Sequence, residues 1–155
     1  MLPGWTLAAM READVDEVLL AERESFVDPW SRHAFLEEVL REAEGGYSRV
    51  LRIDGELAAY MIAWYMFDEA HLANIAVRES FRGRGCARAL LDDFLREGEA
   101  RGALLAFLEV RAGNADAIRL YRGYGFRQVA VRKNYYQAQR EDALVMVREL
   151  RDEEE

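Results

Sequence analysis

Apolar and polar residues follow two patterns along the chain, one typical of strands and one typical of helices. Seven short runs have the length and composition of strands, at about residues 5–10, 47–53, 57–66, 71–77, 103–108, 126–135 and 142–150. Four longer segments repeat their apolar residues with a helical period, at about residues 14–26, 31–44, 87–101 and 114–124. The predicted order is β-α-α-β-β-β-α-β-α-β-β. Because hairpins and helix crossovers coexist, we expect an α/β fold with a mixed sheet and helices on both faces.

Capping and breaking residues define the boundaries of these elements. Asp14 and Ser31 are of the N-cap type, and Pro29 between them cannot continue a helix. Asp54 and Gly55 predict a tight hairpin between the second and third strands. The expected buried side chains are Val15, Val18, Leu19 and Phe26 in the first helix, and Phe35, Leu36, Val39, Leu40 and Ala43 in the second.

Length and composition describe an ordinary globular chain. With 155 residues, 51% apolar and 32% charged, we expect a single domain over residues 1–155, of which 152–155 form a frayed, solvated tail. No apolar run approaches the roughly 20 residues of a membrane span. Acidic residues follow the N-terminus too soon for a signal peptide. Together with the single cysteine, these features predict a cytoplasmic protein without membrane contact.

Charge and metal-binding residue types exclude further classes. The net charge of −8 opposes nucleic-acid binding, which favours a basic balance. The acidic charge either attracts a basic partner or serves solubility alone. Cys86 has no second cysteine for a disulfide or a cysteine-based metal site. His33 and His71 lack the spacing of metal ligands, so we predict no metal and assign both histidines to surface or packing positions.

A short basic turn separates the strand at 71–77 from the helix at 87–101. Residues 82–87 read Arg-Gly-Arg-Gly-Cys-Ala. A glycine turn before a helix can present unpaired amides and the positive end of the helix dipole to an anion, and glycine lets a phosphate approach the backbone. The run matches neither the Walker loop nor the dinucleotide fingerprint, because Arg88 stands where the latter needs its last glycine. It is either a pyrophosphate site or only a surface turn.

Three polar residues near the C-terminal half are candidates for chemistry. Glu109 follows an apolar strand, so it is either paired with Arg111 at the strand end or partly buried, with a pKa raised toward that of a general base. Tyr121 either acts in the site or fills the space between helix and sheet, and Asn114 either caps a helix or touches a ligand. An acyl intermediate on Cys86 is disfavoured, because no histidine is placed to activate the thiol.

Five stretches spread over essentially the whole chain carry a family resemblance. They are residues 28–31 (Asp-Pro-Trp-Ser), 68–70 with 74–77, the turn at 82–87, the run 109–126, and 132–136 with 141–143. The turn fits the Arg/Gln-x-x-Gly-x-Gly/Ala signature of the GCN5-related N-acetyltransferases (the GNAT superfamily), with Ala87 at the position where alanine replaces glycine. The set as a whole resembles the RimI-type branch, the bacterial ribosomal-protein-alanine N-acetyltransferases. The short, glycine-free connection 137–140 departs from that pattern.

The resemblance implies roles for individual residues. It implies that Glu109 is a general base acting through water and that Tyr121 protonates the departing coenzyme A thiolate. It implies that acetyl-CoA is held by the backbone of Ile75, Ala76 and Val77, by the turn residues Arg82, Gly83, Arg84, Gly85, Cys86, Ala87 and Arg88, and by Asn114. It also implies that Trp30, Asn134 and Tyr135 shape a peptide entrance.

The function implied is acetyl-CoA-dependent acetylation of the N-terminal alanine of small-subunit ribosomal protein eighteen. The expected partners are therefore coenzyme A and the N-terminal peptide of a basic ribosomal protein, without direct nucleic-acid binding. An α-amino group has a pKa of about 7.7–8.0, so a modest base suffices for direct attack on the thioester. Two alternatives remain: an acetyltransferase for a small-molecule amine or a lysine, whose pKa is about 10.4, and a non-catalytic acyl-CoA-binding module.

Overall fold

The computed structural model describes residues 1–136 and 140–150, so the frayed tail expected at 152–155 and most of the connection 137–140 lie outside the described residues. The strands are β1 (Trp5–Ala9), β2 (Gly46–Ile53), β3 (Glu56–Met66), β4 (Glu69–Val77), β5 (Leu105–Arg111), β6 (Arg127–Tyr136) and β7 (Glu141–Glu149). The α-helices are α1 (Val15–Ser25), α2 (Arg32–Leu40), α3 (Cys86–Ala100) and α4 (Ala115–Gly123). None of the helices in these two ranges is long and apolar enough to cross a membrane.

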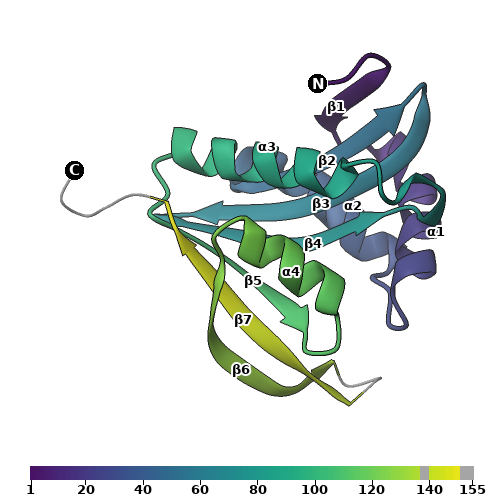
Figure 1. Cartoon of the computed structure of the whole chain (residues 1–155). Helices are drawn as coiled ribbons and strands as arrows, with labels where there is room; N and C mark the ends of the chain where they lie inside the picture. Colours follow the sequence, from purple (N-terminus) through teal and green to yellow (C-terminus); the bar gives the residue numbers. More distant parts are fainter. Residues whose placement is uncertain (137–139, 151–155) are drawn as a thin grey trace.

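The strands form one mixed, seven-stranded sheet in the order β1-β2-β3-β4-β5-β7-β6 (Figure 1). Among the described strands only β4 and β5 are parallel neighbours, and α3 connects them as a crossover. The other neighbouring pairs are antiparallel. Elements follow one another along the chain as predicted, and the mixed α/β class is confirmed. Three short 3-10 helices that the sequence pattern did not indicate precede α1, β2 and α3.

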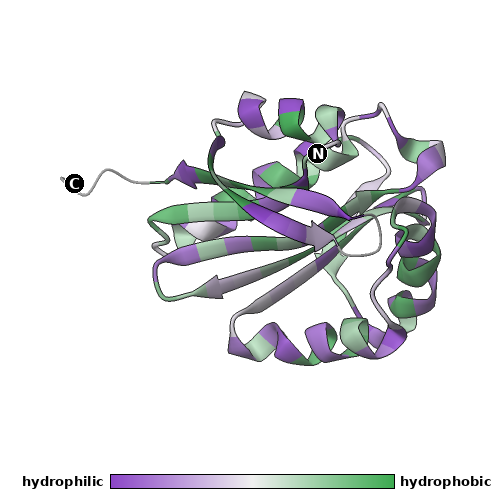
Figure 2. Ribbon diagram, turned by 90° about the horizontal axis from the view of Figure 1, so that it is seen from below, coloured by the Kyte–Doolittle hydropathy of each residue, from purple (hydrophilic) through white to green (hydrophobic). Residues whose placement is uncertain are grey.

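Helices cover both faces of the sheet, as expected. One buried cluster joins α3 and α4 to the sheet through side chains such as Leu90, Phe94 and Tyr121. A second cluster joins α1 and α2 to the opposite face through Val18, Phe35 and Tyr60. In Figure 2 the helices alternate between hydrophobic and hydrophilic colours along their length, as expected for helices with one face packed on a sheet.

The C-terminal ends of the first two helices differ from the prediction. Helix α1 stops at Ser25, and Phe26 is extended beyond it. On α2 the buried positions are Phe35 and Glu38, and the indole N–H of Trp64 donates to the Glu38 carboxylate at 2.8 Å. Leu40, predicted to be buried, is 80% exposed, because two residues beyond Glu38 the helix has turned by about 200°. Ala43 is also exposed, since the chain tightens into a 3-10 helix with a different period.

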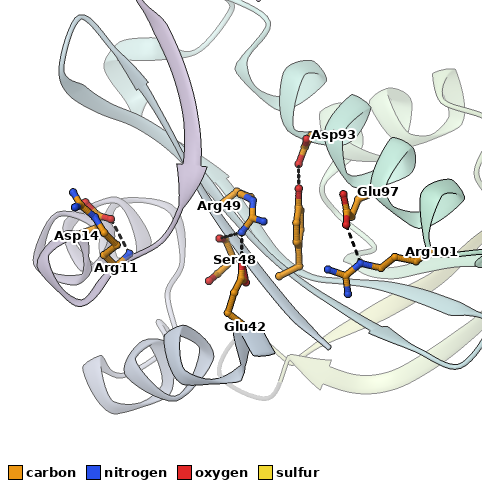
Figure 3. Close-up of polar contacts among 9 residues, drawn as sticks. Arg11, Asp14, Glu42, Ser48, Arg49, Asp93, Glu97 and Arg101 are labelled. Carbon is orange, nitrogen blue, oxygen red and sulfur yellow. Dashed lines mark hydrogen bonds and ion pairs between the residues drawn. The ribbon is translucent and has the colours of Figure 1, made fainter. Parts of the chain in front are cut away.

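A polar cluster joins the strand β2 to helix α3 (Figure 3). The hydroxyl of Tyr47 donates to Asp93 at 2.8 Å, and burial together with this acceptor raises the pKa of Tyr47 to about 12. The guanidinium of Arg49 lies 3.5 Å above the Tyr47 ring, and that of Arg101 lies 5.5 Å from it. These contacts fix α3, and with it the glycine turn at its start, on the sheet.

Candidate active site

Strands β4 and β5 separate part-way along their length. They pair only from Glu69 to Leu72 on β4 and from Leu105 to Leu108 on β5. Beyond these residues β4 stays bonded to β3 as far as Val77, whereas β5 stays bonded to β7 as far as Arg111. The register of β3 and β4 shifts by one residue at the same level, which makes Ala73 a bulge. The two halves of the sheet therefore open into a wedge-shaped gap (Figure 1).

Backbone groups on one side of this gap have no strand partner. The N–H of Arg78 donates to the carbonyl of Ala58 at 2.8 Å, which marks that residue pair as hydrogen-bonded. Because bonded and non-bonded pairs alternate in an antiparallel ladder, Ala76 bonds to β3 while Ile75 and Val77 direct their N–H and C=O groups into the gap. Of these groups, the Val77 carbonyl accepts a hydrogen bond from Arg82 Nε at 3.3 Å. An amide-containing ligand chain can therefore extend β4 at Ile75 and Val77.

The basic turn forms the N-terminal end of α3. Gly83 and Gly85 are left-handed, with φ of 79° and 89°, and Gly85 is the N-cap of the helix. The first helical bond runs from the N–H of Ala89 to the carbonyl of Gly85, so the amides of residues 86–88 have no partner within the helix. Cys86 is buried against the carbonyl of Phe81, and burial raises the pKa of its thiol. Cys86 therefore offers its backbone amide, not a reactive sulfur.

A substitution at Gly85 tests the conformation of this turn. We expect Gly85→Ala to lower the free energy of unfolding by about 1–2 kcal/mol, because φ of 89° places a Cβ in a strained region. Acetyl-CoA affinity, measured by calorimetry, should fall as well. Gly123→Ala is the matched control, since Gly123 ends α4 without a positive φ and with open space around it. Equal effects of the two substitutions would contradict a special role for the left-handed glycine.

A cavity of about 470 Å³ opens beside the gap. Its walls come from the loop between α1 and α2, the middle of β4, the end of β5, the start of α4 and the end of β6. The lining side chains with polar or aromatic groups are Glu22, Phe26, Asp28, Trp30, Asn74, Glu109, Arg111, Asn114, Tyr121, Tyr135 and Tyr136. Six residues that the sequence singled out for catalysis or ligand binding therefore line one cavity: Trp30, Ile75, Glu109, Asn114, Tyr121 and Tyr135. Asn134 is not among its lining residues; its backbone N–H donates to Asp142 at 2.9 Å.

Glu109 is half-buried and ionised. Burial alone raises its pKa, but the hydrogen bond and charge of His71, together with Arg132, lower it more, so the net pKa lies below the usual value. Of the two alternatives, the ion pair with Arg111 is wrong; partial burial is confirmed, but the raised pKa expected from it is wrong. The partners of Glu109 are His71 Nε2, at 2.9 Å from Oε2, and Arg132 Nη1, at 3.6 Å from Oε1.

Asn114 and Tyr121 both belong to α4: Asn114 is its N-cap, and Tyr121 lies near its C-terminal end. Tyr121 is buried and packs edge-on against Phe126, with 6.1 Å between ring centroids. Burial raises its pKa above the ordinary value for tyrosine, so the phenol stays protonated. Asn114 caps α4, because its side-chain oxygen accepts the N–H of Ala117 at 3.2 Å. The capping interpretation of Asn114 is thus confirmed, and its amide also borders the cavity.

Glu22 is a functional candidate that the sequence pattern did not single out. It is 1% exposed on α1 and accepts the Asn74 side-chain amide at 2.9 Å, the Trp30 backbone N–H at 2.8 Å and the Tyr60 hydroxyl. A buried carboxylate with three donors ties the loop between α1 and α2 to the bulge of β4. The sequence did contain one signal for this residue. The helical period of Val15, Val18 and Leu19 continues at position 22, so a carboxylate there is expected on the buried face of the helix.

The comparisons with known proteins match this arrangement. Residues 15–126 match the model of the acetyltransferase (GNAT) family. The chain belongs to the GNAT family. The resemblance inferred from the motifs is therefore confirmed. Acetyl transfer is the activity of this family and acetyl-CoA is its cosubstrate.

Relatives of this GNAT protein are similar over most of its length. It is 36% identical to the [ribosomal protein bS18]-alanine N-acetyltransferase of Escherichia coli strain K12, over 91% of this chain and 95% of that protein. The crystal structure of the E. coli ribosomal-protein-S18-alanine N-acetyltransferase superposes with a TM-score of 0.86, at 35% identity, covering 96% of this chain and 95% of that one. Ard1 from Thermoplasma volcanium superposes with a TM-score of 0.87 at 28% identity, covering 96% and 99%.

The residues present fit acetyl-CoA. Ile75 and Val77 offer backbone amides in the gap, where the amides of a pantetheine arm can pair as a strand would. The unpaired amides at the start of α3 suit a pyrophosphate. Of residues 1–136 and 140–150, none has an atom within 4 Å of the position that a Cβ would take on Gly83 or Gly85, so the turn is open to a ligand.

Proposed function

We propose that this protein acetylates the N-terminal alanine of ribosomal protein bS18. The observation that carries the proposal is the meeting of the β4–β5 gap with the cavity that holds both Glu109 and Tyr121. A cosubstrate in the gap would thereby present its thioester to a peptide N-terminus in the cavity. The 36% identity to the E. coli enzyme of that name, over nearly the full length of both chains, supports the choice of substrate.

On this proposal, acetyl-CoA supplies an activated acetyl thioester and the chain holds it along one continuous path. The backbone of residues 75–77 aligns the acetyl-pantetheine arm, and the turn and first helical residues, 82–88, bind the pyrophosphate. Asn114 adds a contact from the opposite wall. The whole of residues 1–155 acts as one acetyltransferase domain.

Glu109 and Tyr121 divide the proton transfers between them. The carboxylate of Glu109 accepts a proton from the α-ammonium group through a water molecule, which frees the lone pair for attack on the thioester carbonyl. The N–H of Val77, directed into the gap, stabilises the oxyanion of the tetrahedral intermediate. The neutral phenol of Tyr121 donates its proton to the thiolate as it leaves, and the second proton, which the attacking nitrogen loses as the amide forms, restores the phenol. A lowered pKa on Glu109 is compatible with this role, because an α-amine of pKa about 7.7–8.0 is partly unprotonated at neutral pH.

The open side of the cavity suits the start of a basic peptide. Trp30 and Tyr135 provide aromatic walls, and Asn134 lies next to Tyr135 at the end of β6. Among the described residues that line the cavity, the acidic side chains Glu22, Asp28 and Glu109 outnumber the basic Arg111, and the protein as a whole carries −8. Both features favour a cationic N-terminal segment over a neutral one.

A substrate comparison tests the proposal. Purified protein is given acetyl-CoA and a peptide that begins with the alanine of bS18, and release of coenzyme A is followed from pH 6 to pH 9. We expect turnover that rises as the α-ammonium group loses its proton and that is absent when the α-amine is blocked. Faster reaction of an N-blocked lysine peptide would indicate a lysine acetyltransferase instead. Acetyl-CoA binding without turnover on any amine would indicate a binding module.

A further inference from the structure

His71 is held rigidly beside Glu109. Its imidazole stacks on Phe107, with 4.3 Å between centroids and 8° between planes, and Trp64 contacts it edge-on at 5.1 Å. Trp64 is itself fixed by its hydrogen bond to Glu38 of α2. The ring therefore has little rotational freedom, and its Nε2 is directed at Glu109 Oε2.

We propose that His71 is a positioning residue for acetyl transfer, which holds the Glu109 carboxylate in the orientation that borders the cavity. The inference rests on the proposed role of Glu109 as the base. An ionised carboxylate only accepts hydrogen bonds, so the N–H group of this pair is on Nε2, which donates a hydrogen bond to Glu109. Without this bond, the ion pair left to Glu109 among the described residues is the longer one with Arg132, whose side chain is 53% exposed. That pairing would draw the carboxylate toward solvent.

The charges around Glu109 give the inference a pH signature. The titratable or charged groups that face Glu109 or line the same cavity are His71 of β4, Arg111 of β5, Arg132, Tyr135 and Tyr136 of β6, Tyr121 of α4, Glu22 of α1, and Asp28 between α1 and α2. Burial raises the pKa of Glu109, and the hydrogen bond and charge of His71 are the strongest opposing influences. Removing His71 should therefore raise that pKa. Because the reaction needs the ionised carboxylate, the variant should lose rate relative to the wild type as the pH falls.

The test compares His71→Leu and His71→Gln with the wild type on the alanine peptide from pH 5.5 to pH 9. Dividing each kcat/KM by the wild-type value cancels ionisation of the substrate amine. At pH 8 we expect the kcat/KM of His71→Leu to be about tenfold below that of the wild type, because the base is misplaced. Between pH 8 and pH 5.5 the ratio for His71→Leu should fall further, because losing the hydrogen bond and charge of His71 raises the pKa of Glu109. The KM for acetyl-CoA should stay unchanged, which also reports that the variant is folded.

Two comparisons separate positioning from simple packing. His71→Gln keeps a donor, so it should retain activity within about threefold of the wild type at pH 8. His33→Leu is the matched histidine control, since His33 is 81% exposed on α2 and, among the described residues, pairs only with Glu37. The kcat/KM ratio of this variant to the wild type should be close to one at every pH. In a Glu109→Gln background, His71→Leu should change the residual rate by less than about twofold, because the effect passes through Glu109.

Different outcomes overturn different claims. A pH-independent ratio that is the same for leucine and glutamine, or losses that add in the double variant, would overturn the positioning role. An inactive wild-type protein would instead refute the proposed function and the inference with it. An active wild-type protein whose His71→Leu variant has a kcat/KM ratio close to one at every pH would refute the inference alone.

Discussion

Glu109→Gln is expected to lower kcat by about 10²–10⁴-fold while acetyl-CoA still binds. Glutamine has nearly the same shape as glutamate and can remain near His71, but it cannot accept a proton. The side chain borders the cavity beyond the point where β4 and β5 separate, so its replacement leaves the backbone of Ile75 and Val77 unchanged. Steady-state kinetics with the alanine peptide and calorimetry with acetyl-CoA measure the two expectations separately.

The control for this variant is Glu149→Gln. Glu149 lies on β7 with a 65% exposed side chain and pairs with Arg127 at the surface, so the same chemical change there should leave kcat within about twofold. A Glu109→Gln enzyme within threefold of wild-type kcat would remove Glu109 from the role of base. A loss of acetyl-CoA binding by that variant would instead indicate a disturbed cofactor site.

Glu22→Ala is expected to lower the free energy of unfolding by about 3 kcal/mol or more. The substitution leaves the buried Tyr60 hydroxyl, the Asn74 amide and the Trp30 N–H without their acceptor, and each stranded group costs about 1–3 kcal/mol. The melting temperature should fall by about 6–12 °C for a chain of this size. Because the Trp30 loop loses its anchor, the KM for the peptide should rise more than the KM for acetyl-CoA.

Asp16→Ala on the same helix provides the comparison. Within the part of the chain that the structure describes, Asp16 is 79% exposed and bonds only to Arg32 at the surface, so its removal should change stability by less than about 1 kcal/mol. Glu22→Gln should lie between the two, since its carbonyl oxygen can still accept from some of the three donors. A melting temperature for Glu22→Ala as high as that for Asp16→Ala would contradict the importance of the buried network.

The sequence predicted the elements of the site better than their electrostatics. The glycine turn before α3 and the cap at Asn114 could be predicted from the sequence. This is because the geometry of a turn or a cap depends on a few neighbouring residues. The pKa of Glu109 is not a local property. Burial raises it, as expected from the sequence, but His71 lies 38 residues away and reverses the outcome.

By itself, the sequence determined the class of fold, the order of its elements and the family. Hydrophobic period and turn chemistry act over a few residues, and the motif at 82–87 is contiguous. The tertiary structure alone decided three things: the separation of β4 from β5, the anchoring of Trp30 by Glu22, and the pairing of Glu109 with His71. Each depends on which strands and helices become neighbours in space. Burial and hydrogen bonds between residues far apart in the chain then set the position and the pKa of a side chain, and neither can be predicted from its sequence neighbours.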